Sequence, residues 1–295
     1  MVDTEIILIL IGRPQADVQT YLLMINACSH SGDLEGARKI WQNVPDDGIK
    51  YDGQLTTTLI DCLSRRGSLD EALRLIEQYE ERTNRPYHAM WSSLLFGCKK
   101  YEDVEFAERV YGAMQQRFKR DDQRMASATV LMSNIYVGAG EVEKGNAIRR
   151  EMKLQGIKKE PAISEIDVHG ELCRFYAGDK QRGNAVDREL HALKERLTTE
   201  CGYEPDLKCV TRELREGESG EDVLLVHSEK IALVYGLMHT DKDYDIVINK
   251  NLRICQDCHN FIKLAAQLTE RRITVADANR VHIFDDGRCS CNDYY

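Results

Sequence analysis

The stretch Gly-Asp-Leu-Glu-Gly-Ala at residues 32–37 decides the first half of the fold, because it recurs at a fixed distance along the chain. It returns as Gly-Ser-Leu-Asp-Glu-Ala at 67–72 and, weakened, as Glu-Asp-Val-Glu-Phe-Ala at 102–107, so that each copy begins 35 residues after the one before. A fourth copy, at 140–145, begins 38 residues after the third. A period of this length is typical of helical repeat proteins.

Each repeat has the pattern of two helices joined by a turn. In the second repeat, apolar residues recur with a helical period over 55–63, Arg-Gly-Ser at 66–68 predicts a turn, and a second amphipathic stretch runs over 69–79. One hairpin cannot bury its own apolar face, so we expect four hairpins to stack into an α-helical repeat solenoid with a shared core. Three cysteines lie on the apolar stripe of the first helices and are expected to be core residues without a redox role: Cys28, Cys62 and Cys98.

The composition describes an ordinary soluble chain. Its 295 residues, 42% of them hydrophobic, predict about two domains. The longest apolar run, at 6–11, is far shorter than the roughly 20 residues of a membrane-spanning helix, so no membrane contact is expected. The formal net charge of −9 argues against indiscriminate binding of nucleic acid, so that a nucleic-acid partner must be held selectively. The first residues show no targeting segment, which leaves open whether the chain is a fragment.

Beyond Pro161 the helical period stops, and an α/β domain is expected. Residues 163–168 and 172–176 alternate like the two strands of a hairpin. Strands alternating with helices predict a layered sheet. The further expected elements are a helix at 184–200, an exposed loop at 212–222, a helix at 223–238, a strand at 244–254, a helix at 256–269 and a final buried strand at 272–276.

Four residues of this second half have the types and the order that a zinc-dependent deaminase needs. His227 and Glu229 form a His-x-Glu motif, and Cys255 and Cys258 form a Cys-x-x-Cys motif that begins 28 residues after His227. A hydrolytic zinc site uses three protein ligands and leaves the fourth position to water, while a carboxylate that does not bind the metal moves protons. We therefore predict a catalytic zinc on His227, Cys255 and Cys258, with Glu229 as the catalytic acid and base. Each motif alone has a structural alternative, such as a solvated helix face for His-Ser-Glu.

Four more residues of ligand type remain: His259, His282, Cys289 and Cys291. Two histidines and two cysteines can close a tetrahedral zinc site with no open position, which is typical of structural zinc. His259 suits this second site because adjacent helical residues point about 100° apart. The alternative is that the cysteines are free surface thiols and that His282 is solvated. The prediction is therefore two zinc ions per chain.

The first half resembles a known family of RNA-binding proteins. Thr-Tyr-Leu-Leu-Met-Ile-Asn-Ala-Cys at 20–28 and Gly-Ile-Lys-Tyr-Asp at 48–52 are similar to pentatricopeptide repeats, while 91–95, 131–136 and 152–161 resemble the two extension motifs of plant-type organellar RNA-editing proteins. The resemblance implies repeats over 1–90, extension hairpins over 91–160 and single-stranded RNA as the partner, at roughly one base per repeat.

The second half resembles the DYW deaminase domain of the same family, over 161–295. The similar stretches are His-Ser-Glu-Lys-Ile-Ala at 227–232, the run from Lys250 to His259, and Cys-Ser-Cys-Asn-Asp-Tyr-Tyr at 289–295, although the last residue is Tyr295 where the family name expects Trp. The resemblance implies site-specific RNA editing by deamination of cytidine to uridine, a mitochondrial location, and protein editing cofactors as further partners. Three alternatives stay open: a noncatalytic RNA-binding adaptor with a structural zinc domain, a deaminase of free cytidine, and the reverse amination of uridine.

Overall fold

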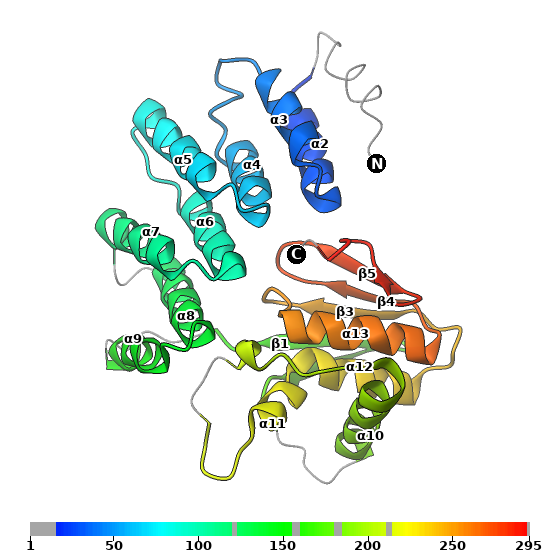
Figure 1. The fold of residues 1–295 in the computed structure, drawn as a ribbon. Coiled ribbons are helices and arrows are strands. Elements are labelled where there is room, and N and C mark those ends of the chain that lie inside the picture. Colours follow the sequence, from blue (N-terminus) through cyan, green and yellow to red (C-terminus); the bar gives the residue numbers. More distant parts are fainter. Residues whose placement is uncertain (1–15, 120–122, 155–159, 180–184, 211–213, 294–295) are drawn as a thin grey trace. The chain divides into compact units, whose positions relative to one another are not determined.

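The computed structural model describes residues 16–119, 123–154, 160–179, 185–210 and 214–293. The chain divides into two compact units, one that extends to Lys159 and one from Glu160 to Asp293. Figure 1 shows that the first unit is entirely helical, whereas the second combines a sheet with helices. Within the described residues, no helix has both the length and the apolar character needed to cross a membrane.

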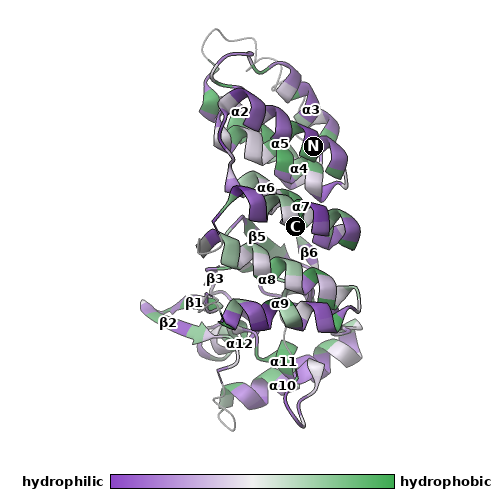
Figure 2. Ribbon diagram, turned by 90° about the vertical axis from the view of Figure 1, so that its left-hand side faces the viewer, coloured by the Kyte–Doolittle hydropathy of each residue, from purple (hydrophilic) through white to green (hydrophobic). Residues whose placement is uncertain are grey.

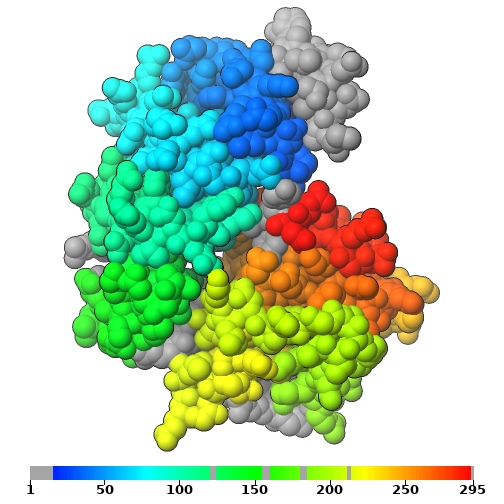
Figure 3. All heavy atoms as spheres, viewed as in Figure 1, coloured from blue at the N-terminus to red at the C-terminus, as the bar shows by residue number. Residues whose placement is uncertain are grey.

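The first unit consists of four helical hairpins, as the period predicts. In the space-filling view these hairpins follow one another in sequence order, from blue to green (Figure 3). The helices are α2 (Val18–Ser31), α3 (Leu34–Gln42), α4 (Gly53–Arg65), α5 (Leu69–Thr83), α6 (His88–Tyr101), α7 (Val104–Arg117), α8 (Gln123–Gly138) and α9 (Val142–Leu154).

The recurring sequence stretch is the turn between the two helices of a hairpin. Gly32 adopts the left-handed conformation, with φ 73°, and ends α2, after which the Asp33 side chain accepts a hydrogen bond from the backbone N–H of Gly36 and begins α3. Gly67 does the same between α4 and α5, with φ 79°. In the third copy Glu102 takes this position with φ 56°, so a side chain is tolerated where glycine is favoured. The weakening of the third copy therefore leaves the turn intact.

The first helices of successive hairpins form the core of this unit. Helix α4 packs against α2 and α6, and α6 packs against α8. Figure 2 shows hydrophilic as well as hydrophobic residues on these helices, as expected for elements with one buried face. Cys28, Cys62 and Cys98 are buried in this core, and burial raises the pKa of their thiols to about 11, 12 and 12. The predicted structural placement of these cysteines is confirmed.

The second unit contains a six-stranded sheet with the order β2-β1-β3-β4-β5-β6. The first two strands form the predicted antiparallel hairpin, β1 pairs antiparallel with β3, and β3 pairs parallel with β4. The strands are β1 (Ile163–Val168), β2 (Glu171–Tyr176), β3 (Ile246–Lys250), β4 (Ile273–Ala276), β5 (Val281–Asp285) and β6 (Arg288–Cys289). The helices are α10 (Ala185–Cys201), α11 (Gly220–Leu225), α12 (Ser228–His239) and α13 (Gln256–Thr269), with a short 3₁₀ turn η1 (Leu207–Cys209).

Several predicted elements of this unit need correction. The helix expected over 223–238 is two helices, α11 and α12, because the backbone is extended at His227. The strand expected over 244–254 is limited to Ile246–Lys250, and the strand at 273–276 is followed by β5 and β6 rather than being the last. The loop expected over 212–222 ends earlier, since α11 begins at Gly220, and its residues 212 and 213 lie outside the described residues.

Candidate metal and catalytic site

A break between two helices places the first predicted ligand. His227 precedes α12 with φ −67° and ψ 139°, so its side chain lies at the amino end of the helix. Cys255 has the same role for α13, where its sulfur accepts a hydrogen bond from the backbone N–H of Cys258. The helix dipole and free amides at such a position favour a negatively charged sulfur. The structure thus brings two helix amino ends together at one point.

The three predicted ligands of the first site converge. The distance from His227 Nδ1 is 3.5 Å to Cys255 Sγ and 3.3 Å to Cys258 Sγ. In a tetrahedral zinc site, bond lengths near 2.1 and 2.3 Å place nitrogen and sulfur ligands about 3.5 Å apart. The donor set and its spacing therefore fit zinc. His227 and Cys255 are only half-buried, so the group faces a surface that a substrate could reach.

The electrostatics of this cluster favour thiolate at Cys255. Hydrogen bonds from the thiols of Cys209 and Cys258 lower the pKa of Cys255 well below its usual value, although burial opposes them. Burial, together with the hydrogen bond to Cys255, raises the pKa of Cys258. The sequence did not indicate Cys209, because it belongs to neither motif and reaches Cys255 only through the path of the chain around η1. The hydrogen bond to Cys255 is the largest cause that raises the pKa of Cys209.

The predicted proton-transfer residue, Glu229, is in the first turn of α12 and is 3% exposed. Its Oε2 accepts a hydrogen bond from Ser228 Oγ at 3.1 Å and lies 3.3 Å from Lys250 Nζ. These two contacts fix the position of the Glu229 carboxylate beside the ligand cluster.

A buried ion pair joins the two helices that carry the ligands. Lys230, on α12, is 2.6 Å from Asp257 on α13, and both side chains are almost completely buried. Tyr203 completes the group, because its hydroxyl donates to Asp257 at 2.6 Å and accepts from Lys230 at 3.0 Å. A buried ion pair that also satisfies its remaining hydrogen-bonding groups is costly to break. This group fixes the spacing of the two helix amino ends, and the sequence motifs do not reveal it.

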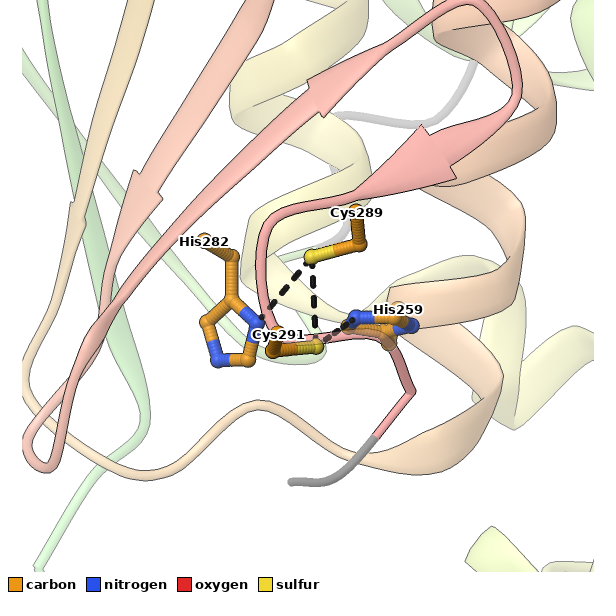
Figure 4. Close-up of side chains that lie close together, drawn as sticks. All are labelled: His259, His282, Cys289 and Cys291. Atoms are coloured by element: carbon orange, nitrogen blue, oxygen red, sulfur yellow. Dashed lines mark hydrogen bonds between the residues drawn. The ribbon is translucent and has the colours of Figure 1, made fainter. Parts of the chain in front are cut away.

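The second predicted cluster also assembles, from α13, β5 and the segment around β6 (Figure 4). The ligand atoms of His259, His282, Cys289 and Cys291 all lie within 4.8 Å of one another, and all four residues are buried. Cys289 and Cys291 face the same side because Ser290, between them, donates its backbone N–H to the Ile283 carbonyl as in a continued strand.

The distances in this second cluster suit a closed tetrahedral site. His259 Nε2 is 3.3 Å from Cys291 Sγ, His282 Nδ1 is 3.6 Å from Cys289 Sγ, and the two sulfurs are 3.2 Å apart. The hydrogen bond with Cys289, followed by those with His259 and His282, lowers the pKa of Cys291 to about 2. These contacts favour the thiolate, which is the form that binds zinc. The alternative of free surface thiols is inconsistent with this burial.

Carboxylates face the outer ring nitrogens of both histidines. Asp277 Oδ2 is 3.5 Å from His282 Nε2, and Asp293 Oδ1 is 3.8 Å from His259 Nδ1. Histidines that bind metals commonly present their second nitrogen to a carboxylate, which fixes the orientation of the ring. Asp277 also accepts a hydrogen bond from the backbone N–H of Ile254, directly before Cys255. Asp277 lies outside the quoted motifs, and Asp293, although within the 289–295 stretch, was not predicted to contact a ligand.

The fold and the two clusters define a helical repeat protein joined to an α/β domain of nucleic-acid deaminase type. Family models match in that order: the PPR repeat at 19–49 and 56–82, the E motif at 101–167, and the DYW family of nucleic acid deaminases at 202–295. The chain belongs to the pentatricopeptide repeat proteins of the DYW type.

Curated relatives agree with this assignment. The mitochondrial pentatricopeptide repeat-containing protein At5g46460 of Arabidopsis thaliana is 34% identical over 283 residues, covering 95% of this chain and 39% of the relative. The chloroplastic protein At3g57430 of the same organism is 36% identical over 279 residues, covering 94% of this chain and 30% of the relative. The chain therefore spans well under half the length of these relatives.

Among solved structures, the chain is similar to the pentatricopeptide repeat protein PPR10 in complex with an 18-nt psaJ RNA element. The match has 16% identity and a TM-score of 0.31, and it covers 91% of this chain and 47% of PPR10.

Proposed function

We propose that this protein is a zinc-dependent RNA cytidine deaminase that edits cytidine to uridine in single-stranded organellar RNA. The observation that carries the proposal is the contrast between the two clusters. His227, Cys255 and Cys258 give three ligands on a half-buried surface beside a buried carboxylate, whereas the other cluster has four ligands and is completely buried. Three ligands with an open position are typical of hydrolytic zinc, and four buried ligands of structural zinc. We therefore propose two zinc ions per chain, with different roles.

The residues of the first site have distinct tasks in this reaction. Zinc, when bound, supplies Lewis acidity that brings the pKa of a water molecule near neutrality. Glu229 would take a proton from the attacking water and return protons to N3 of cytosine and to the departing ammonia. His227, Cys255 and Cys258 would hold the metal at the helix amino ends. An unpaired base suits this geometry because the reacting base must leave any stack to reach the site.

The solenoid supports RNA as the substrate rather than free cytidine. Pentatricopeptide-type repeats read single-stranded RNA at about one base per repeat. Two repeat matches are few, so the proposed RNA contact of this chain is limited to a short segment of the transcript. Relatives named as mitochondrial and chloroplastic support an organellar location. The mitochondrion is our specific proposal, and the chloroplast is its alternative.

Substituting Glu229 tests the proposal without knowledge of the target transcript. The zinc-loaded chain is incubated with a library of single-stranded RNAs in which a central cytidine has random flanking sequence, and cytidine-to-uridine changes are counted by sequencing. We expect editing by the wild-type chain and a loss of at least about 100-fold for Glu229→Gln. Both chains should contain two zinc ions by elemental analysis.

The outcomes separate the alternatives. A wild-type chain that binds the RNA and two zinc ions but edits no more than Glu229→Gln would favour the noncatalytic adaptor. Faster turnover of free cytidine than of RNA would favour a nucleoside deaminase. Conversion of a central uridine to cytidine in a matched library would favour the reverse reaction.

A further inference from the structure

A buried lysine that is neither a predicted metal ligand nor the predicted acid and base, although it begins the 250–259 stretch, contacts the Glu229 carboxylate. Lys250 is the last residue of β3, and its side chain is 2% exposed. A lysine ammonium is rarely buried unless it is paired, because removing its charge from water is costly. In this structure the ammonium is 3.3 Å from Glu229 Oε2 and donates a hydrogen bond to Ser228 Oγ at 2.8 Å.

The hydroxyl of Ser228 forms a second, indirect link between Lys250 and Glu229 Oε2. Ser228 donates to Glu229 Oε2 at 3.1 Å, and its oxygen lies 2.9 Å from Ser164 Oγ on β1. The Glu229 carboxylate can only accept and the Lys250 ammonium can only donate, so the single proton of Ser228 points to Glu229, and Ser164 is then the donor to the Ser228 oxygen. Two strands of the sheet therefore direct hydrogen bonds toward one oxygen of the carboxylate.

The two oxygens of Glu229 are thus unequal. Oε2 interacts with Ser228 and Lys250, whereas Oε1 has no hydrogen-bonding partner among the residues that the structure describes. An oxygen that already accepts from a cation is a poor proton acceptor, and the other one remains available. We propose that Lys250 is a positioning residue that fixes Oε2, directly and through Ser228, so that Oε1 exchanges protons with the substrate. This inference rests on the proposed deaminase function.

A double-mutant cycle on stability tests the coupling without using activity. The variants Lys250→Met, Glu229→Gln and their combination are compared by thermal unfolding of the zinc-loaded full chain. Lys250→Met in the wild-type background leaves a buried carboxylate without its cation and should lower the melting temperature of the second unit by roughly 10 °C. In the Glu229→Gln background the same change should lower it by no more than about 3 °C, because no buried negative charge is left behind.

The chain offers a matched control pair. Lys242 and Glu270 are 3.2 Å apart in the same unit, but their side chains are 74% and 79% exposed. Lys242→Met and Glu270→Gln should show no coupling, because exposed ion pairs contribute little. Equal losses for Lys250→Met in both Glu229 backgrounds would show that the lysine supports only the fold, and would overturn the proposal.

The editing kinetics of the same variants provide a second test beside the double-mutant cycle on stability. On the RNA that the library selects, Lys250→Met should lower kcat by about 100-fold with KM unchanged, because misplacing a catalytic group costs rate rather than binding. Ser228→Ala, which keeps Lys250, should give an intermediate loss, and Lys250→Arg should recover part of the rate. If Lys250→Met fails to fold, Ser228→Ala alone decides, and an unchanged kcat would contradict the proposal.

The failures of the two proposals can be distinguished. Editing by the wild-type chain together with an additive stability cycle contradicts only the role of Lys250. Absence of editing by a wild-type chain that contains two zinc ions contradicts the deaminase function, and the positioning role fails with it.

Discussion

One hydrogen bond, between Tyr136 and Glu108, makes the stability of the first unit depend on pH. Tyr136 OH donates to Glu108 Oε1 at 2.8 Å, and Lys144 Nζ lies 3.4 Å from the same oxygen. The hydrogen bond from Tyr136 is the largest cause that lowers the pKa of Glu108 below the usual 4.5. Because the pKa is lower in the folded state, this stabilisation is present above pH 4.5 and is lost as the pH falls through the folded value.

We expect Tyr136→Phe to lower the free energy of unfolding of the first unit by no more than about 1 kcal/mol at pH 7, because the Glu108 side chain is 44% exposed. The loss should shrink below pH 4.5 as Glu108 becomes protonated. Thermal unfolding at a series of pH values measures both effects. The control is Tyr101→Phe, since Tyr101 OH donates to the backbone carbonyl of Arg65, which does not titrate. A loss that is the same at every pH in both variants would contradict this account.

At the same residue scale, the sequence predicts the metal-ligand candidates but not their supporting groups. The spacing of His227, Cys255 and Cys258 is a local signal, because each motif lies at the start of one helix. Lys250 is the last residue of β3 and Asp277 directly follows β4, and they reach Glu229 and His282 only because β3 and β4 pair in parallel and place their carboxyl ends together. That placement depends on tertiary structure, which short motifs do not encode.

At the scale of elements, the helical spacing of apolar residues predicts a helix well where one face is buried and a capping residue is present. Helix α13 has the expected bounds, Gln256–Thr269, since Cys255 caps its start and Glu270 ends it in the left-handed conformation. The division between α11 and α12 is missed because apolar residues continue through Val226, so the pattern gives no sign of the extended backbone at His227. Strand β6 is missed because it has two residues, and β5 is missed because its buried face carries His282 while Val281 is exposed, so apolar residues do not mark the buried face.

Two glycines in neighbouring helices should respond oppositely to alanine. A Cβ at Gly97 on α6 would lie 2.7 Å from the Ser64 Cβ and 2.9 Å from its carbonyl oxygen on α4, whereas a Cβ at Gly112 on α7 would meet nothing within 4 Å. We expect Gly97→Ala to lower the free energy of unfolding by about 1–3 kcal/mol, because the helices must separate. Gly112→Ala should raise it by about 0.5–1 kcal/mol through helix propensity. Urea unfolding of both variants measures these changes, and stabilisation by Gly97→Ala would contradict the close packing.

At the scale of the whole molecule, the two units differ in what stabilises them. The first has a continuous apolar core of helix faces, while the second places eight predicted functional residues on and around one sheet and its helices. Six of the described helices and strands of the second unit lie in the span from His227 to Cys291 that connects the ligands. Metal binding should therefore contribute to the folding of the second unit alone.

A zinc chelator should distinguish the unfolding transitions of the two units in calorimetry. We expect the zinc-loaded chain to unfold in two transitions, of which a zinc chelator lowers one by more than about 10 °C and leaves the other unchanged, because a ligand that binds only the folded state stabilises only the unit that binds it. Cys289→Ser, which removes one ligand of the buried cluster, should lower the same transition. A single transition that moves as a whole with chelator would contradict independent stabilisation of the units.

Helix α13 has a consequence for how such a chain can diverge. Cys258 and His259 are adjacent in sequence but belong to different clusters. Their side chains point in different directions because successive residues of a helix are rotated by about 100°. A one-residue insertion or deletion in the first turn would turn both side chains away from their partners together. Gene lineages that lose catalysis by such a change would lose the buried cluster in the same event, whereas a substitution at Glu229 would silence the chemistry and leave a folded protein.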